Sequence, residues 1–245
     1  NSKYHPGVKK IIRNENNFIG GKVYLLKSHI IKDKYFYKPQ ESRKKFHFSN
    51  FTAFSTRNIC HLGHECIHRR VLKNKNKLLI AIIVSEKNKY KIRHIENTYK
   101  ILKKQKIYKK TKLIKIFIPS LHAGPNEAFL QAILFQNLGL KKFIVGRDHA
   151  GIKNFYKKYE AQKIFSIDKS LKIKILKTKE PVRCLYCNVI GFENEKFCNK
   201  NKKKCKFVSI DGKFVKKQMN LRNFDVLKNY INADVIKYIK KNVKV

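Results

Sequence analysis

The feature that most constrains the fold is a regular alternation of short apolar runs with stretches of helical spacing. Residues 78–84 form a continuous apolar run, which is typical of a strand covered on both faces. A helical pattern over 90–102 follows, then a strand-like run over 113–118, a helix over 127–138 and a strand over 143–145. Strands that alternate with helices in this way predict an α/β fold with a doubly wound, mostly parallel, Rossmann-like sheet.

Two polar turns follow predicted strands. A strand over 51–54 leads into residues 55–64, and the strand over 143–145 leads into residues 146–151. In a doubly wound sheet, ligands bind at the carboxyl ends of the strands. His61 and His64 lie three residues apart at the start of a predicted helix, where they share one face and suit an anion such as phosphate. The alternative is a pair of surface histidines on an ordinary helix.

The charge of the chain points to a polyanionic partner. Lys and Arg number 58 against 16 Asp and Glu, which gives a formal net charge of +42. A surface this basic repels itself unless a polyanion neutralises it, so we expect RNA or another polyanion, within a larger assembly. Mutational drift in an A/T-rich genome, which raises Lys, Asn, Ile, Phe and Tyr together, is the alternative. No apolar run approaches the about 20 residues that span a bilayer, so we expect no membrane partner.

Four cysteines fall within one Lys-rich stretch, and they are Cys184, Cys187, Cys198 and Cys205. Four thiols in two pairs match a tetrahedral structural zinc site better than two disulfides. Because the second pair is spaced loosely, four free thiols are the alternative, whereas Cys60 and Cys66 are expected to be buried and inert. This cysteine usage favours an intracellular, reducing compartment, with an organelle (mitochondrion or plastid) favoured over the cytosol.

Several motifs occur in one order along nearly the whole chain. Thr56-Arg57-Asn58 with His61 and His64 comes first, Ala123-Gly124-Pro125 with Glu127-Ala128 follows, and residues 143–151 read F-I-V-G-R-D-H-A-G. These segments resemble the Q-T-R-N-P-x-H-x-x-H, A-G-P-R-E-A and F-I-V-G-R-D-H-A-G motifs of ATP sulfurylase (sulfate adenylyltransferase), the last without a change. Two further segments resemble that enzyme family. The end of its N-terminal PUA-like domain is similar to His5-Pro6-Gly7-Val8 with Gly20-Gly21-Lys22-Val23, and the four cysteines are similar to a zinc-binding insertion found in some members.

The resemblance implies a nucleotidyltransferase reaction in which ATP and sulfate yield adenylyl sulfate and pyrophosphate. It implies that His61 and His64 contact the nucleotide phosphates and that Arg57 with Asn58 holds sulfate. The residues that line the nucleotide would be Gly146, Arg147, Asp148 and His149.

Four positions depart from the family motifs. Ser55 replaces Gln, Ile59 replaces Pro, and Leu121 and Asn126 replace two arginines. Arginine binds tetrahedral oxyanions through paired donors, which none of these residues can replace. We therefore expect a pseudoenzyme that has lost sulfate adenylylation and serves as a basic, RNA-binding structural component of a ribonucleoprotein such as an organellar ribosome. The alternative is an active, divergent sulfate adenylyltransferase.

We expect four parts along the chain. Residues 1–45 would be the end of a PUA-like β domain and a linker, with β stretches at 8–12 and 23–26 and a helix from Pro39. Residues 46–180 would form the nucleotidyltransferase-like α/β domain and 181–210 the four-cysteine zinc-knot insertion. Residues 211–245 would form a C-terminal helical segment that contains one amphipathic helix over 224–239.

Overall fold

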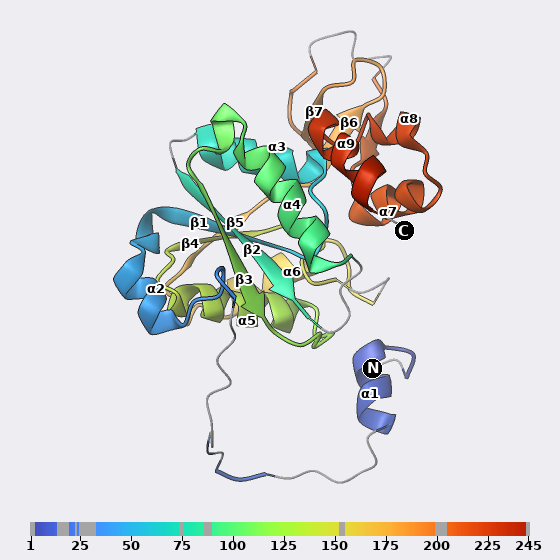
Figure 1. The fold of residues 1–245 in the computed structure, drawn as a ribbon. Helices are drawn as coiled ribbons and strands as arrows, with labels where there is room; N and C mark the ends of the chain where they lie inside the picture. Colours follow the sequence, from blue (N-terminus) through green and yellow to red (C-terminus); the bar gives the residue numbers. More distant parts are fainter. Residues whose placement is uncertain are drawn as a thin grey trace.

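A parallel sheet forms the centre of the molecule (Figure 1). The structure is a computed structural model that describes residues 3–13, 20–22, 24, 33–73, 76–85, 90–151, 155–198 and 205–243. Five strands lie in the order β3-β2-β1-β4-β5, and every neighbouring pair is parallel. They are β1 (Phe51–Thr56), β2 (Lys77–Val84), β3 (Thr111–Phe117), β4 (Lys142–Val145) and β5 (Lys174–Lys177). The predicted α/β class and parallel sheet are confirmed.

Helices cover both faces of this sheet (Figure 1). Along β2, Leu78, Ile80 and Ile82 pack into one core, whereas Leu79 and the other alternate residues pack into a second core on the opposite face. This explains why the run over 78–84 is apolar throughout. Helices α3 (Leu62–Lys73) and α4 (Ile92–Lys103) cover the first face, and α5 (Pro125–Asn137) and α6 (Glu160–Ile167) cover the second. Short 3-10 helices η1 (Phe48–Asn50) and η2 (Lys106–Tyr108) precede β1 and β3.

The last quarter of the chain packs against the face that carries α3 and α4. A small antiparallel sheet has the order β7-β6-β8, and its strands are β6 (Pro181–Cys184), β7 (Ile190–Phe192) and β8 (Phe207–Ser209). Three helices follow it, α7 (Gly212–Asn220), α8 (Phe224–Leu227) and α9 (Ala233–Asn242), and they contribute to the first core. The single helix expected over 224–239 is wrong. The Asn232 side chain accepts a hydrogen bond from the Asp234 N–H and starts α9 as a separate helix.

The N-terminal segment also differs from expectation. The predicted β stretch at 8–12 is wrong, because these residues lie in α1 (Pro6–Arg13). Pro6 takes the first helical position, and the Gly7 N–H donates to His5 Nδ1 at 3.2 Å, so both residues favour a helix start. Most of the second expected β stretch, at 23–26, lies outside the described residues, and the PUA-like origin of residues 1–45 stays a prediction. A second helix, α2 (Pro39–Lys45), precedes the sheet.

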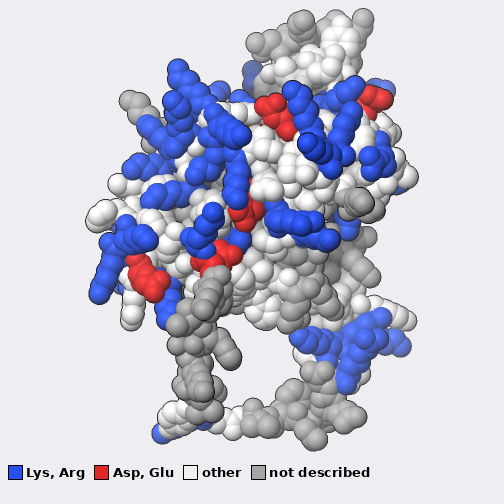
Figure 2. All heavy atoms as spheres, viewed as in Figure 1, with Lys and Arg blue, Asp and Glu red and all other residues white. Residues whose placement is uncertain are grey.

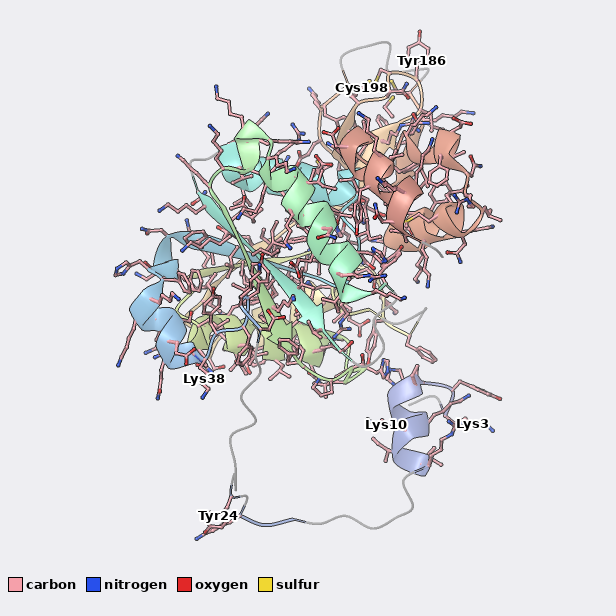
Figure 3. All side chains as sticks on the ribbon, in the orientation of Figure 1. Lys3, Lys10, Tyr24, Lys38, Tyr186 and Cys198 are labelled. Atoms are coloured by element: carbon pink, nitrogen blue, oxygen red, sulfur yellow. The ribbon has the colours of Figure 1, made fainter. Side chains whose placement is uncertain are left out.

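The small sheet and α1 lie at opposite ends of the view. Figure 3 labels Tyr186 and Cys198 beyond β6 and β7, and Lys10 on α1. No helix within the described ranges is long and apolar enough to cross a membrane.

Candidate functional site

The sheet topology places two polar turns side by side. Strands β1 and β4 are neighbours at the centre of the sheet, yet the chain leaves β1 towards β2 and leaves β4 towards β5. The carboxyl ends of such a divergent pair form the topological switch point, where doubly wound proteins bind ligands. Ser55 and Thr56 end β1, and Gly146 follows β4. The two turns singled out in the sequence therefore meet at one edge of the sheet.

We call one set of residues the switch-point site, and its members are Ser55, Arg57, Asn58, His61, His64 and His149. Arg57 is bound by Glu127, the carboxylate of which comes from the first turn of α5 and is almost fully buried. The Asn58 N–H donates to Thr56 Oγ1 at 3.0 Å, which folds the chain back after β1. The guanidinium is thereby fixed in place, with its charge neutralised by a buried acid.

A hydrogen-bond network joins the end of β1 to the turn after β4. The Ser55 hydroxyl donates to Gln131 Oε1 at 2.7 Å, and His149 Nε2 lies 2.8 Å from the same oxygen. An amide oxygen only accepts, so in this arrangement His149 carries its hydrogen on Nε2. Burial lowers the pKa of His149 to about 4, and the nearby charge of Arg57 acts in the same direction. His149 is therefore neutral at pH 7.

The two histidines predicted to bind an anion lie together. The rings of His61 and His64 stack with centroids 3.8 Å apart and an interplanar angle of 27°. Burial lowers the pKa of His61 to about 4, with Asp211 opposing that shift. Burial and the charges of His61 and His68 also hold the pKa of His64 well below its usual value. His64 Nδ1 lies 3.3 Å from the Tyr99 hydroxyl. Both rings are neutral hydrogen-bonding groups at pH 7, and the reading of two surface histidines is wrong.

A third histidine lies beneath this pair. His68 is fully buried on α3, its Nδ1 lies 3.2 Å from the Tyr108 hydroxyl, and burial lowers its pKa to about 3. Its Nε2 also lacks a partner among the described residues, but the whole residue lies beneath His61 and His64, so we assign it a structural position under the pair.

Two buried nitrogens of the switch-point site lack a partner among the described residues. Arg57 Nε and His61 Nδ1 are buried and form no hydrogen bond with any of them. Buried polar groups are almost always satisfied, and those that are not mark positions where a ligand or water completes the bonding. Phosphate or sulfate oxygens, which only accept hydrogen bonds, suit Arg57 Nε, and they suit His61 Nδ1 in the tautomer that carries its hydrogen on that nitrogen.

The turn over residues 146–151 divides into two parts. His149 reaches the network of Ser55 and Gln131, whereas Arg147 Nε lies 3.5 Å from Glu180 Oε1, beside the first residue of β6. A Cβ on Gly151 would lie 1.7 Å from Asp148 Oδ1, so a larger residue there would displace the Asp148 side chain. The structure therefore ties Arg147, predicted to line the nucleotide, to the small sheet.

Sequence reasoning missed Glu127, Gln131 and Tyr99. Glu127 and Gln131 are one turn apart on α5, and both are buried on a helix that otherwise buries apolar residues. That spacing of two buried polar groups on one face was a usable signal. Nothing in the sequence marks Tyr99, whose role depends on the packing of α4 against α3. Leu121 and Asn126, the replacements for family arginines, are exposed.

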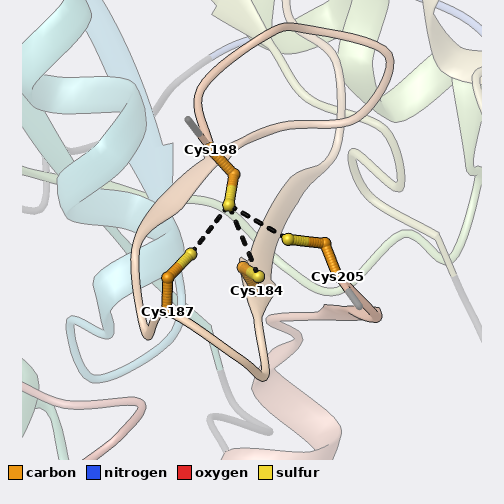
Figure 4. A group of neighbouring side chains, drawn as sticks. All are labelled: Cys184, Cys187, Cys198 and Cys205. Carbon is orange, nitrogen blue, oxygen red and sulfur yellow. Dashed lines mark hydrogen bonds between the residues drawn. The ribbon is translucent and has the colours of Figure 1, made fainter. Parts of the chain in front are cut away.

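The four cysteines of the expected metal site come together at the end of the small sheet (Figure 4). All four sulfur atoms lie within 4.8 Å of one another, and Cys198 Sγ lies 3.8 Å from Cys184 Sγ. Cys198 Sγ lies closer to Cys187 Sγ and Cys205 Sγ, at 2.8 and 3.2 Å, than the roughly 3.8 Å between sulfur atoms on a tetrahedral zinc ion with Zn–S bonds of about 2.3 Å. The four-thiol donor set fits zinc, and two of its sulfur pairs would separate on binding. Cys60 is buried and Cys66 half-buried, and burial raises the pKa of both thiols, that of Cys66 to about 11.

Comparisons with known proteins agree on one family. A profile of the family described as ATP-sulfurylase matches residues 33–241. The chain is 34% identical over 206 residues to the sulfate adenylyltransferase of Pyrococcus abyssi, which covers 81% of this chain and 54% of that protein. For the sulfate adenylyltransferase of Ignicoccus hospitalis, the identity is 34% over 202 residues, 79% of this chain and 52% of that protein. The chain thus spans about half the length of the curated relatives it matches.

A solved structure resembles the fold alone. A hexameric APS kinase from Thiobacillus denitrificans superposes with a TM-score of 0.59 over 85% of this chain and 40% of that chain, at 14% identity.

Proposed function

Because the chain belongs to the ATP-sulfurylase family, we propose that it binds ATP at the switch-point site and transfers the adenylyl group to sulfate. The observation that carries this proposal is the pair of buried nitrogens without a described partner, Arg57 Nε and His61 Nδ1, at the carboxyl end of β1. Arg57 Nε is a donor, His61 Nδ1 is one in the tautomer that carries its hydrogen there, and both lie where a doubly wound fold binds phosphates. The relatives named sulfate adenylyltransferase support the choice of reaction.

The reaction needs little from the protein beyond positioning. A sulfate oxygen attacks the α-phosphorus in line, a new P–O bond forms, and the bond to pyrophosphate breaks, with its electron pair leaving on pyrophosphate. Arg57 would bind the oxyanions, and the histidine pair would donate N–H groups to the nucleotide phosphates. Tyr99, by donating to His64 Nδ1, would leave the His64 Nε2–H free for a phosphate oxygen.

The replaced arginines set the expected rate. Loss of one preorganised donor costs roughly 100- to 1,000-fold in kcat. With Leu121 and Asn126 at the two positions where the resemblance implies arginine, we expect slow turnover.

The test is sulfate-dependent release of pyrophosphate from ATP. We expect release above background in the parent protein, its loss in His64→Ala, and its retention in the control His47→Ala, since His47 is exposed next to η1 before β1. Release that does not depend on sulfate, or equal release by His64→Ala and the parent protein, would contradict the proposal.

A second function is favoured by the charge of the surface. Figure 2 shows Lys and Arg over much of one face, with Asp and Glu at only a few places, and the chain carries +42. We propose that the protein also binds RNA, as a component of a ribonucleoprotein such as an organellar ribosome. Binding should weaken steeply as salt rises, and a flat dependence between low and physiological salt would overturn it.

We propose that Cys184, Cys187, Cys198 and Cys205 hold one structural zinc ion. When bound, zinc would fix the end of the small sheet through four thiolates. Elemental analysis of the purified protein should give about one zinc per chain, and Cys187→Ser should abolish it, whereas Cys66→Ser should not.

A further inference from the structure

Lysines mark the amino ends of the parallel strands. Lys77, Lys142 and Lys174 are the first residues of β2, β4 and β5, and Lys112 is the second residue of β3. Lys174 pairs with Lys142, and Lys77 and Lys142 pair with adjacent residues of β1, Phe51 and Thr52. Because side chains alternate along a strand, Lys77 and Lys112 lie on the α5 and α6 side of this edge, and Lys142 and Lys174 lie on the α3 and α4 side. Neighbouring strands are about 4.8 Å apart, so the row from β3 to β5 extends roughly 19 Å along the edge of the sheet.

Part of this row lies over an aromatic cluster. The Lys112 ammonium is 4.1 Å from the centroid of the Phe46 ring and 5.7 Å from that of Phe51. Lys77 lies 5.6 Å from the Phe51 ring, and Lys45, from the last turn of α2, lies 5.7 Å from the Phe46 ring. Phe51 is buried and Phe46 half-buried, so lysine side chains cover these rings and leave little ring surface for stacking on a base.

We name Lys45, Lys77, Lys112, Lys142 and Lys174 the lysine edge. None of the five forms an ion pair with a described Asp or Glu. By contrast, Lys115, three residues along β3 from Lys112, lies 2.7 Å from Asp33 and 3.0 Å from Glu96. Within the described part of the chain, acids thus form ion pairs with a lysine inside the sheet, whereas no acid lies within 4.0 Å of the ammonium groups at its edge.

The crowding of like charges has a measurable signature. Burial lowers the pKa of Lys112, and the charges of Lys77, Lys103 and Lys45 lower it further. Lysines this close repel one another, and a bound anion removes that repulsion.

We propose that the lysine edge binds the phosphate backbone of RNA. This rests on the proposed RNA binding and gives it a location. A row of charges roughly 19 Å long at one edge of the sheet suits a linear chain of phosphates better than a planar lipid surface. Lysine is a point charge that contacts phosphates without reading bases, so binding is independent of sequence. The edge lies at the opposite ends of the strands from the switch-point site, so RNA and ATP do not compete.

The test compares two variants that remove the same charge. In the edge variant, Lys45, Lys77 and Lys174, all exposed, are each changed to Gln. In the control variant, Lys163, Lys217 and Lys241, exposed on α6, α7 and α9, are each changed to Gln. Fluorescence anisotropy with a labelled oligouridine measures affinity across a salt series, and circular dichroism checks that both variants melt at the parent temperature.

The edge variant should lose three phosphate contacts. With about 0.7 counterions released per contact on a single strand, the slope of log K against log salt falls by about 2, and affinity at 0.15 M salt falls about 50-fold. The control should retain the parent slope. Equal losses in the two variants would overturn the location while leaving RNA binding in place, whereas no binding by the parent protein would overturn RNA binding itself. Loss of binding to phosphatidylserine vesicles without loss of RNA binding would assign the edge to membranes instead.

Discussion

Burial of neutral histidines should make this protein sensitive to mild acid. Burial holds the pKa of His61 and His149 at about 4 and that of His68 at about 3. In the unfolded chain each would titrate near about 6.5. Because the folded-state pKa is the lower one, the stability from these neutral rings is fully present above about pH 6.5. It is lost as the pH falls from there towards the folded-state values.

The size of the effect follows from the shifts. At pH 5, each of the three histidines binds a proton only on unfolding, at a cost in stability of about 2 kcal/mol, or about 6 kcal/mol together. A domain of ordinary stability has only about 5–15 kcal/mol in total. We therefore expect the free energy of unfolding to fall by at least about 4 kcal/mol per pH unit between pH 6 and 5, because His64, whose pKa burial also lowers, adds to these three.

Urea titration at pH 7, 6 and 5, followed by far-UV circular dichroism, measures this slope, because the chain has no Trp for fluorescence. The variant His68→Gln lacks one of four such histidines, since burial also lowers the pKa of His64, so its slope should fall by about one quarter. By contrast, His47→Gln, at an exposed position, should keep the parent slope. Equal free energies of unfolding at pH 7 and pH 5 would refute the reasoning.

Three further perturbations test the packing around the site. Gly124→Ala adds a Cβ within 2.6 Å of the Tyr156 ring at a φ of +51°, so it should lower the free energy of unfolding by about 2–4 kcal/mol in urea titration. The double variant Gly124→Ala/Tyr156→Ala should recover part of that loss, and a loss below about 1 kcal/mol in the single variant would contradict the geometry. Glu127→Gln leaves Arg57 without its buried partner and should destabilise the protein by about 3–5 kcal/mol, whereas an unchanged urea midpoint would show that the pair is dispensable. Removing zinc with a chelator should lower the melting temperature of the parent protein but not of a zinc-free cysteine variant; equal shifts in both would point to an effect of the chelator elsewhere.

The sheet could be predicted from the sequence because its apolar runs are long enough to define their period. The run over 78–84 is apolar throughout, and the structure buries alternate residues in two cores. The apolar run over 8–12 is too short for its periodicity to distinguish a helix from a strand. There the structure forms a helix that begins at Pro6. At 224–239 the period held, but the side chain of Asn232 started a new helix inside the expected one.

The same distinction between local pattern and tertiary packing applies to the switch-point site. Its loops could be predicted, because they follow strands whose carboxyl ends converge in any doubly wound sheet. The partner of Arg57 could not, because Glu127 lies 70 residues away and reaches it only once α5 packs on the sheet. The tautomer of His64 likewise depends on Tyr99, which α4 supplies. The local sequence pattern thus predicts which loops form the site, whereas the packing of distant helices determines which of its charged groups are neutralised.

The position of the free charges bears on both proposed functions. The switch-point site holds neutral histidines and an arginine neutralised by Glu127, whereas lysines without a described acidic partner lie at the amino ends of the strands. Lys77 pairs with Phe51, and Phe51 is five residues from Thr56, so about 17 Å of strand separates that charge from the site. This is about two Debye lengths at physiological salt. The lysine edge therefore cannot replace the arginines missing from the switch-point site, and its charge requires a ligand of its own.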